Sequence, residues 1–342
     1  MTSTRRISVA RAVVESLKAE KVRFVFGLVG SYVLAIYDAL LDAPNINHVV
    51  VKHENNAAFM AGMYGYLTGK PGVVLVTAGP GATNSISGVA QAYTQSMPMV
   101  HICGGVPLGS GNAAYHGVDR EHILNKIFLN ITKWTVRVDR TVEIPNILSQ
   151  ALSLAVSGRP GPVNVDIPSD IIHAKNVEMP VYRQSSVKKL SPQEKDLKPI
   201  CHMLAKSHRP MICAGRGVLI HRAETELALL AEAISAPVLS TYDSNGAIAE
   251  DHSLAVGIFE EWRENLLAVK LLKKSDFLLC LGLRSNTSLS ESLFKKAPRN
   301  VVFVALDEQY TLHLMDGIIT VISDTRIFLS QLLLHIDEFR RP

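Results

Sequence analysis

The 342-residue sequence contains no long apolar run. No stretch of about 18 or more uncharged apolar residues occurs, which argues against a membrane-spanning helix. Residues 1–6 lead into an amphipathic pattern and not into the apolar core of a secretory signal peptide. The sequence therefore predicts a cytoplasmic protein that does not enter the membrane.

Cysteines, aromatic residues and blocks of like charge are also scarce. The four cysteines lie far apart in the sequence: Cys103, Cys201, Cys213 and Cys280. No two of them form a Cys-x-x-Cys pair, which favours buried free thiols over disulfides or zinc ligands. The formal net charge is only +4 and the basic residues are scattered, so nucleic-acid binding is not expected.

Apolar strands alternate with helical patterns from residue 7 to residue 168. Helical spacing of apolar residues predicts helices over 7–17, 32–41, 55–67, 84–95, 121–128 and 146–157. Short apolar runs predict strands over 22–26, 49–51, 73–76, 99–102 and 162–168. Continuously apolar strands separated by helices are typical of a parallel sheet with helices on both faces.

A second alternation follows a polar stretch over residues 177–198, which is rich in Lys, Ser, Gln and Pro. Helices are predicted over 199–206 and 224–234, and strands over 210–214, 237–242, 277–281 and 301–306. We therefore predict two doubly wound α/β domains with parallel sheets, residues 1–176 and a Rossmann-like domain over 199–342, joined by a linker over 177–198.

Glu54 stands where a predicted strand ends and a helix rich in small residues begins. Side chains at such a transition face the crevice at the carboxyl ends of the strands, where open α/β sheets place their ligands. Glu54 is therefore the first candidate for a functional residue. The alternative is that its carboxylate only stabilises the start of the helix.

Three motifs follow one another around this residue: HExxA at 53–57, GKPGVV at 69–74 and GPGATN at 79–84. Together they resemble the pyrimidine-binding domain of thiamine-diphosphate enzymes of the acetolactate synthase type, whose relatives include the 2-oxo acid decarboxylases. The resemblance covers residues 5–170 well and continues more loosely to about residue 335. It implies a lyase or carboligase in which the cofactor forms a carbanion at its thiazolium ring.

The resemblance assigns roles to individual positions. It implies that Glu54 is catalytic, because the family's glutamate hydrogen-bonds a pyrimidine nitrogen and favours the imino form of the ring. Residues 27–30 match the family's FGxPG loop, except that Val29 replaces the proline. The cofactor-binding positions that the resemblance implies are Gly27, Gly30, Glu54, Thr77, Gly79, Pro80, Gly81 and Asn84. For Asn84, an ordinary polar role at a helix start is the alternative.

Tyr115 and His116 occupy the place where acetolactate synthases carry a Phe-Gln-Glu stretch. We expect both to contact substrate and His116 to be catalytic, because histidine titrates near neutrality and can move protons. This departure argues against conversion of pyruvate to acetolactate. An ordinary loop histidine is the alternative for position 116.

FAD or ADP is a further cofactor that the resemblance leaves open. Arg159 lies in a hexapeptide, residues 158–163, whose arginine contacts FAD in acetolactate synthases but which also occurs in relatives without flavin. Gly215 and Arg216 follow a strand and could meet a nucleotide phosphate. However, no full GxGxxG follows, and residues 283–286 lack the aspartates of flavin-binding relatives.

No GDG motif, the family's marker for binding Mg²⁺ and the diphosphate, occurs in the sequence. We therefore predict no metal ligands in this chain, and expect Mg²⁺ and the diphosphate to be held by a partner subunit of a hetero-oligomer. A fragment of a longer chain is the alternative, although the basic residues closing the last predicted helix favour a natural end.

The remaining expectations concern substrates and rival functions. The resemblance implies self-association into a dimer or tetramer and a 2-oxo acid or acyl-CoA substrate. A noncatalytic regulatory or assembly subunit that retains the fold is the main alternative function. A nicotinamide-dependent dehydrogenase is disfavoured, because no GxGxxG follows the first strand.

Overall fold

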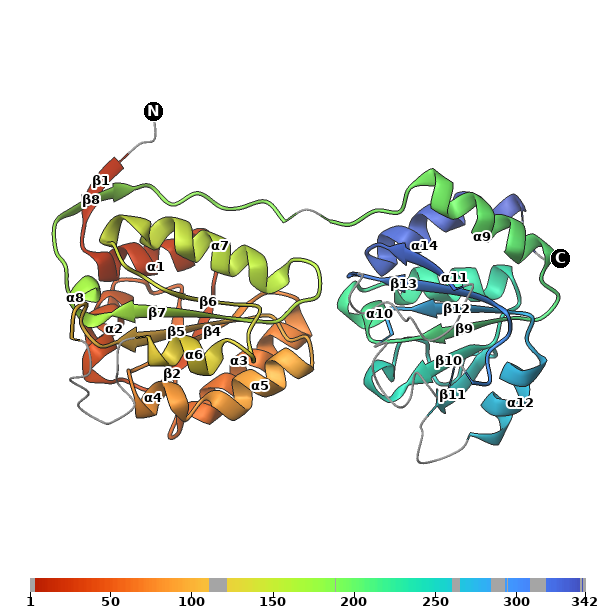
Figure 1. Ribbon diagram of the computed structural model, residues 1–342, viewed down its shortest axis with the longest axis horizontal. Coiled ribbons are helices and arrows are strands. Elements are labelled where there is room, and N and C mark those ends of the chain that lie inside the picture. The colour runs from red at the N-terminus through yellow and green to blue at the C-terminus, as the bar shows by residue number, and fades with distance from the viewer. Residues whose placement is uncertain are drawn as a thin grey trace. The chain divides into compact units, whose positions relative to one another are not determined.

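The chain folds into two units that each contain one parallel sheet (Figure 1). The computed structural model describes residues 4–110, 122–187, 189–259, 265–283, 293, 295–307, 318–338 and 340. Contacts divide the chain into residues 1–188 and 189–342. Each unit has a six-stranded parallel sheet between helices, which confirms the predicted α/β fold class.

In the first unit the strand order is β3-β2-β4-β5-β7-β6, and all neighbours are parallel. The strands are β2 (Phe24–Gly27), β3 (Asn47–Val50), β4 (Gly72–Val76), β5 (Met99–Gly105), β6 (Trp134–Arg137) and β7 (Pro162–Pro168). β4, β5 and β7 are buried along their whole length, as their apolar sequences require.

Helices cover both faces of this sheet, as Figure 1 shows. One face packs against α1 (Val9–Ala19), α2 (Leu34–Leu41) and α7 (Ile144–Val156). The other packs against α3 (Glu54–Thr68), α5 (Ile86–Thr94) and α6 (Ile123–Phe128). The short helices are η1 (Ser31–Val33), α4 (Pro80–Thr83), η2 (Thr141–Glu143) and α8 (Ser169–Ile172).

α3 approaches its neighbours closely because its buried face consists of alanine and glycine. Ala57, Ala58 and Ala61 are fully buried, and a Cβ atom at Gly65 would lie 2.2 Å from the Pro98 carbonyl oxygen. His53 caps the start of α3 by accepting a hydrogen bond from the Asn55 N–H, and the helix ends at Gly69 with φ of +70°. This close packing fixes the direction in which Glu54 leaves the sheet edge.

The connection between the units is shorter than the predicted linker over 177–198. Val177–Pro180 form β8, which pairs antiparallel with β1 (Thr4–Ile7). The next helix, α9 (Glu194–Lys206), starts at a capping box made by Gln193 and Asp196 and not at Pro199, which lies inside the helix. The sequence analysis did not predict β8, because this strand is short and its partner β1 is far away in the sequence.

In the second unit the strand order is β11-β10-β9-β12-β13-β14. The strands are β9 (Pro210–Ala214), β10 (Val238–Thr241), β11 (Ala255–Phe259), β12 (Phe277–Leu281), β13 (Asn300–Ala305) and β14 (Ile319–Ile322). The helices are α9, α10 (Gly217–Ile220), α11 (Glu224–Ala233), η3 (Tyr242–Ser244), α12 (Leu266–Lys274), α14 (Thr325–Leu333) and η5 (Ile336–Glu338).

The four cysteines are buried and unpaired, as predicted, and burial raises the pKa of each thiol. None of the helices in the described part of the chain has the length and hydrophobicity that a bilayer crossing needs.

Two glycines of α3 test how closely this helix packs. Gly69→Ala should lower the free energy of unfolding by about 1 kcal/mol, because alanine strains the positive φ but meets no atom within 4 Å. Gly65→Ala should cost more, since its Cβ clashes with backbone and α3 must move. Chemical denaturation of both variants measures the difference, and an equal cost would contradict the described contact with Pro98.

Candidate functional site

Glu54 lies at the carboxyl edge of the first sheet, where the strand ends of β3, β2 and β4 meet. It is the first residue of α3 and follows β3 after three residues. It is only 7% exposed, which is unusual for a glutamate that has no basic partner among the described residues. β2 ends at Gly27 and the loop after β4 begins at Thr77, so both predicted binding loops reach the same edge.

The carboxylate of Glu54 is held on one side only. Its Oε2 accepts a hydrogen bond from the Asn84 side-chain amide at 3.0 Å, whereas Oε1 accepts none from the part of the chain that the structure describes. A second hydrogen bond joins α5 to the start of α3, because the Gly88 N–H donates to Asn55 Oδ1 at 2.8 Å. Glu54 is therefore oriented while one of its oxygen atoms remains available to a ligand.

Two glycines pack against Thr77, and one of them adjoins Oε1 of Glu54. A Cβ atom at Gly30 would lie 2.4 Å from the Thr77 Cβ, and one at Gly81 would lie 2.7 Å from Thr77 Cγ2 and 3.6 Å from Glu54 Oε1. Gly79 has φ of +58°, which favours glycine, and Pro80 is the first residue of α4. The fold thus places Gly81 and Asn84 beside Glu54, with Thr77 and Gly30 packed next to them.

Tyr37 on α2 is a member of this region that the sequence analysis missed. Its hydroxyl donates to the Leu75 carbonyl oxygen at 2.6 Å, and a Cβ at Gly27 would lie 2.3 Å from the same hydroxyl. Burial, followed by the negative charge of Glu54, raises the pKa of Tyr37. A single tyrosine among aliphatic residues over 34–41 was the available signal.

A buried polar network lies beneath the turn that carries Asn84. Ser85 Oγ is 2.8 Å from His101 Nε2, and His101 Nδ1 is 2.8 Å from Asn164 Oδ1. The distances match those of a serine–histidine–asparagine catalytic triad. However, all three residues are 0% exposed, so no substrate reaches the hydroxyl and the network is structural in this conformation.

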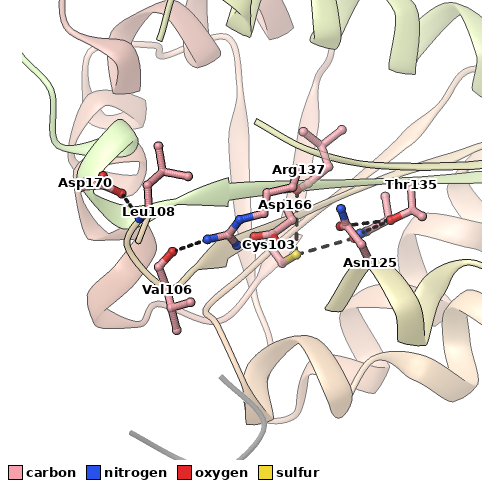
Figure 2. Close-up of polar contacts among 10 residues, drawn as sticks. Cys103, Val106, Leu108, Asn125, Thr135, Arg137, Asp166 and Asp170 are labelled. Atoms are coloured by element: carbon pink, nitrogen blue, oxygen red, sulfur yellow. Dashed lines mark hydrogen bonds and ion pairs between the residues drawn. The ribbon is translucent and has the colours of Figure 1, made fainter. Parts of the chain in front are cut away.

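An ion pair is buried at the same edge of the sheet, between the ends of β6 and β7 (Figure 2). Arg137 Nη1 donates to Asp166 Oδ2 at 2.7 Å, and Nη2 donates to the Val106 carbonyl oxygen at 2.7 Å. The side chains are 3% and 1% exposed. Burial raises the pKa of Asp166, and the positive charge of Arg137 opposes this rise. Because Arg137 also donates to the Val106 carbonyl oxygen, the pair fixes the start of the loop after β5.

Comparison with known proteins identifies the family. Residues 7–125 match the family model described as thiamine pyrophosphate enzyme, N-terminal TPP binding domain, and residues 197–332 match the central domain of the same enzymes. The chain belongs to the thiamine pyrophosphate enzymes. Thiamine pyrophosphate is another name for thiamine diphosphate, so the predicted family is confirmed.

Among similar proteins are three acetolactate synthase large subunits. The one from Methanocaldococcus jannaschii, named as probable, is 33% identical over 87% of this chain and 51% of its own length. The one from Corynebacterium glutamicum is 32% identical over 96% of this chain and 52% of its own length. The one from Buchnera aphidicola subsp. Acyrthosiphon pisum is 33% identical over 96% of this chain and 58% of its own length. The chain thus spans about half the length of the curated relatives it matches.

Two predicted site residues of this thiamine pyrophosphate enzyme, Tyr115 and His116, lie outside the described residues. Arg159, a predicted FAD contact, precedes β7 and so lies at the opposite edge of the sheet from Glu54. Its guanidinium donates to Ser96 Oγ and to the Tyr93 and Thr94 carbonyl oxygen atoms. These bonds join the loop before β7 to the end of α5.

Gly215 and Arg216, the predicted nucleotide contacts of the second unit, follow β9. The N–H groups of Gly215 and Gly217 donate to the carbonyl oxygen atoms of Leu281 and Gly282 at 2.8 and 3.1 Å. A Cβ at Gly215 would lie 2.6 Å from the Gly282 carbonyl oxygen, so close packing already accounts for this glycine. Arg216 is buried. The FAD or ADP interpretation stays a prediction.

One group in the described part of the chain places three metal-ligating atom types within 4.8 Å of one another: Cys201, His335 and Glu338. His335 Nδ1 lies 2.9 Å from Glu338 Oε1, as a local pair three residues apart. Burial raises the pKa of the Cys201 thiol to about 11, which opposes the thiolate form that metals bind. This local pairing accounts for the group without an ion.

The Arg137–Asp166 pair should be costly to break from one side. Arg137→Leu leaves a buried carboxylate without its partner, and we expect a loss of about 3 to 5 kcal/mol in the free energy of unfolding. The double variant Arg137→Leu/Asp166→Leu should recover most of it. Trp134 fluorescence during urea unfolding, in a Trp262→Phe background, measures the free energy of unfolding of the first unit. Losses in the double variant that equal the sum of the two single losses would contradict the pairing.

His101 should make the stability of the first unit depend on pH. Burial lowers the pKa of His101 to about 4, whereas an unfolded histidine titrates near ~6.5, so the unfolded chain binds the proton more tightly. The contribution of neutral His101 to the free energy of unfolding is complete above pH ~6.5 and is lost as the pH falls towards 4. It amounts to roughly 3 kcal/mol in all. His101→Gln should show a correspondingly flatter dependence in the same unfolding assay. Identical slopes would disprove a neutral, buried His101.

Proposed function

We propose that this chain is a subunit of a split thiamine-diphosphate-dependent lyase or carboligase, in which Glu54 activates the cofactor. The observation on which this depends is the carboxylate of Glu54, 7% exposed, with Oε2 bonded to Asn84 and Oε1 beside Gly81. A flat ring could approach the backbone closely here, because Gly81 has no side chain and a Cβ atom on it would lie 3.6 Å from Oε1. The residues present therefore fit the pyrimidine ring of the cofactor.

When bound, the cofactor would supply the carbanion chemistry by which a bond beside a substrate carbonyl breaks or forms. The part of this chain is placement and proton control. Glu54 Oε1 would share a proton with a pyrimidine nitrogen, while Asn84 holds Oε2 in place. Thr77 and the Gly79–Gly81 turn would support the ring. Tyr37 joins α2 to β4 through its hydrogen bond to the Leu75 carbonyl oxygen.

The diphosphate and Mg²⁺ would be bound by a different polypeptide. Support comes from the lack of a GDG motif in these 342 residues. Mg²⁺ prefers near-octahedral oxygen ligands. No such group of carboxylates occurs near Glu54 among residues 4–110 and 122–187.

The exposed face of α3 supports a partner at this position. Four large apolar residues on it are between 44% and 66% exposed: Phe59, Met60, Met63 and Leu67. The first three line an apolar hollow of about 330 Å³ together with Met97. Exposed apolar patches of this kind mark interaction sites. Because α3 begins with Glu54, a subunit on this face would stand beside the cofactor, and we assign the face to the diphosphate-binding subunit.

The substrate class proposed is a 2-oxo acid or an acyl-CoA relative, acted on in the cytoplasm. Support comes from the acetolactate synthase large subunits among the relatives, whose named activity belongs to those proteins. Formation of acetolactate itself is disfavoured by the sequence at Tyr115 and His116.

The experiment is a comparison of turnover by native protein and Glu54→Gln, each mixed with the partner subunit, thiamine diphosphate and Mg²⁺, on a panel of 2-oxo acids. Glu54→Gln keeps the shape of the side chain but removes the proton-accepting carboxylate, so we expect a loss of at least about 100-fold. The matched control is Glu143→Gln, the same change at the start of α7. Glu143 accepts hydrogen bonds from the exposed Arg140, and it follows β6, which is the edge strand farthest from β3 in the strand order.

Native turnover in Glu143→Gln together with the loss in Glu54→Gln would support the proposal. Equal rates for Glu54→Gln and native protein would remove Glu54 from the mechanism. If no mixture binds thiamine diphosphate, the chain is a noncatalytic assembly subunit instead.

A further inference from the structure

The turn that presents Asn84 to Glu54 is bonded from two sides. On one side, Asn84 donates to Glu54 and the Gly88 N–H donates to Asn55, so the turn is tied to the start of α3. On the other side, Ser85 reaches into the sheet and meets His101 of β5. The sheet side matters because Asn84 is itself exposed, whereas Ser85 is buried.

The hydrogen-bond pattern around His101 defines which ring nitrogen is protonated. The Asn164 side-chain amide donates to Thr135 Oγ1 at 2.9 Å, so its oxygen faces His101 Nδ1. In the neutral ring Nδ1 therefore donates and Nε2 accepts. The Ser85 hydroxyl lies 2.8 Å from Nε2 and 2.6 Å from the Ala82 carbonyl oxygen, and with Nε2 as an acceptor its single proton is donated to the ring.

The ring itself is fixed by the strands. In the parallel register His101 pairs with Val74 of β4 on one side and with Asn164 of β7 on the other. Phe128 of α6 packs on the ring with a centroid separation of 4.8 Å. A buried hydrogen-bonded network sets one geometry more strictly than apolar packing does.

We propose that His101 is a positioning residue for Glu54: through Ser85 it fixes the turn that holds Asn84 against the Glu54 carboxylate. An apolar side chain at position 101 would keep the core filled but would release Ser85 from the sheet. Asn84 would then lose its fixed place relative to Oε2 of Glu54. The value of this arrangement to catalysis rests on the proposed function of Glu54, whereas the arrangement itself does not.

The test is NMR spectroscopy of the ¹⁵N-labelled full chain without cofactor. The side-chain amide signals of Asn84, assigned by their loss in Asn84→Ala, report the hydrogen bond to Glu54. Their position in Glu54→Ala gives the reference for the broken bond. In His101→Leu we expect the signals to move most of the way towards that reference, because the sheet no longer holds Ser85.

Three further variants separate positioning from general loosening. Ser85→Ala cuts the same link from the other residue and should shift the Asn84 signals in the same direction, also if His101→Leu fails to fold. His101→Gln keeps a hydrogen-bonding side chain and should restore the native position. Leu148→Ala, a fully buried change in the core on the opposite face of the sheet, should lower the melting temperature and leave the signals unmoved.

Native Asn84 signals in both His101→Leu and Ser85→Ala would overturn the proposal, and so would an equal shift in Leu148→Ala. In the reconstituted enzyme, His101→Leu should raise the KM for thiamine diphosphate several-fold while its kcat falls less than that of Glu54→Gln. Full activity of Glu54→Gln would refute the proposed function but would leave the NMR result on His101 standing.

Discussion

The single hydrogen bond between Asn84 and Glu54 is the interaction on which the functional interpretation depends. It orients a nearly buried carboxylate without neutralising it, because an amide provides no positive charge. Burying a charged group is costly unless it is hydrogen-bonded, so a carboxylate bonded at one oxygen only is poised to bind another donor. Gly81 lies beside the other oxygen, where a Cβ atom would be 3.6 Å from Oε1.

The first unit treats buried polar groups in two ways. Arg137 and Asp166 satisfy each other as charges at the end of β7, although Arg137 Nε and Asp166 Oδ1 have no further hydrogen-bond partner among the described residues. Ser85, His101 and Asn164 form a neutral network one strand nearer to Glu54. Both lie below loops at the carboxyl edge, so the rigid sheet extends its order into the segments that surround the site.

Much of the site was predictable because the fold class and the local motifs agree. In a parallel sheet the loops after neighbouring strands meet at one edge, so the motifs after β2, β3 and β4 had to converge once the alternation was recognised. The cofactor-side residues Gly30, Thr77 and Gly81 followed from the resemblance. The structure adds which oxygen of Glu54 is bonded and which faces the glycines.

The missed features depend on pairings that a linear sequence does not contain. His101 and Asn164 each interrupt an apolar strand, and only the register of β5 with β7 shows that they lie side by side. β6 and β8 are short and partly exposed, so neither has the apolar run by which the central strands were recognised. A polar residue inside an otherwise apolar strand was the signal for the network.

The central claim is that Glu54 meets the pyrimidine ring of thiamine diphosphate. The most direct measurement is the ¹⁵N NMR spectrum of cofactor labelled in that ring, bound to this chain together with its partner subunit and Mg²⁺. A ring-nitrogen signal that shifts on binding to native protein, and loses that shift in Glu54→Ala while the cofactor stays bound, is the predicted result. A bound signal unchanged by Glu54→Ala would contradict the account.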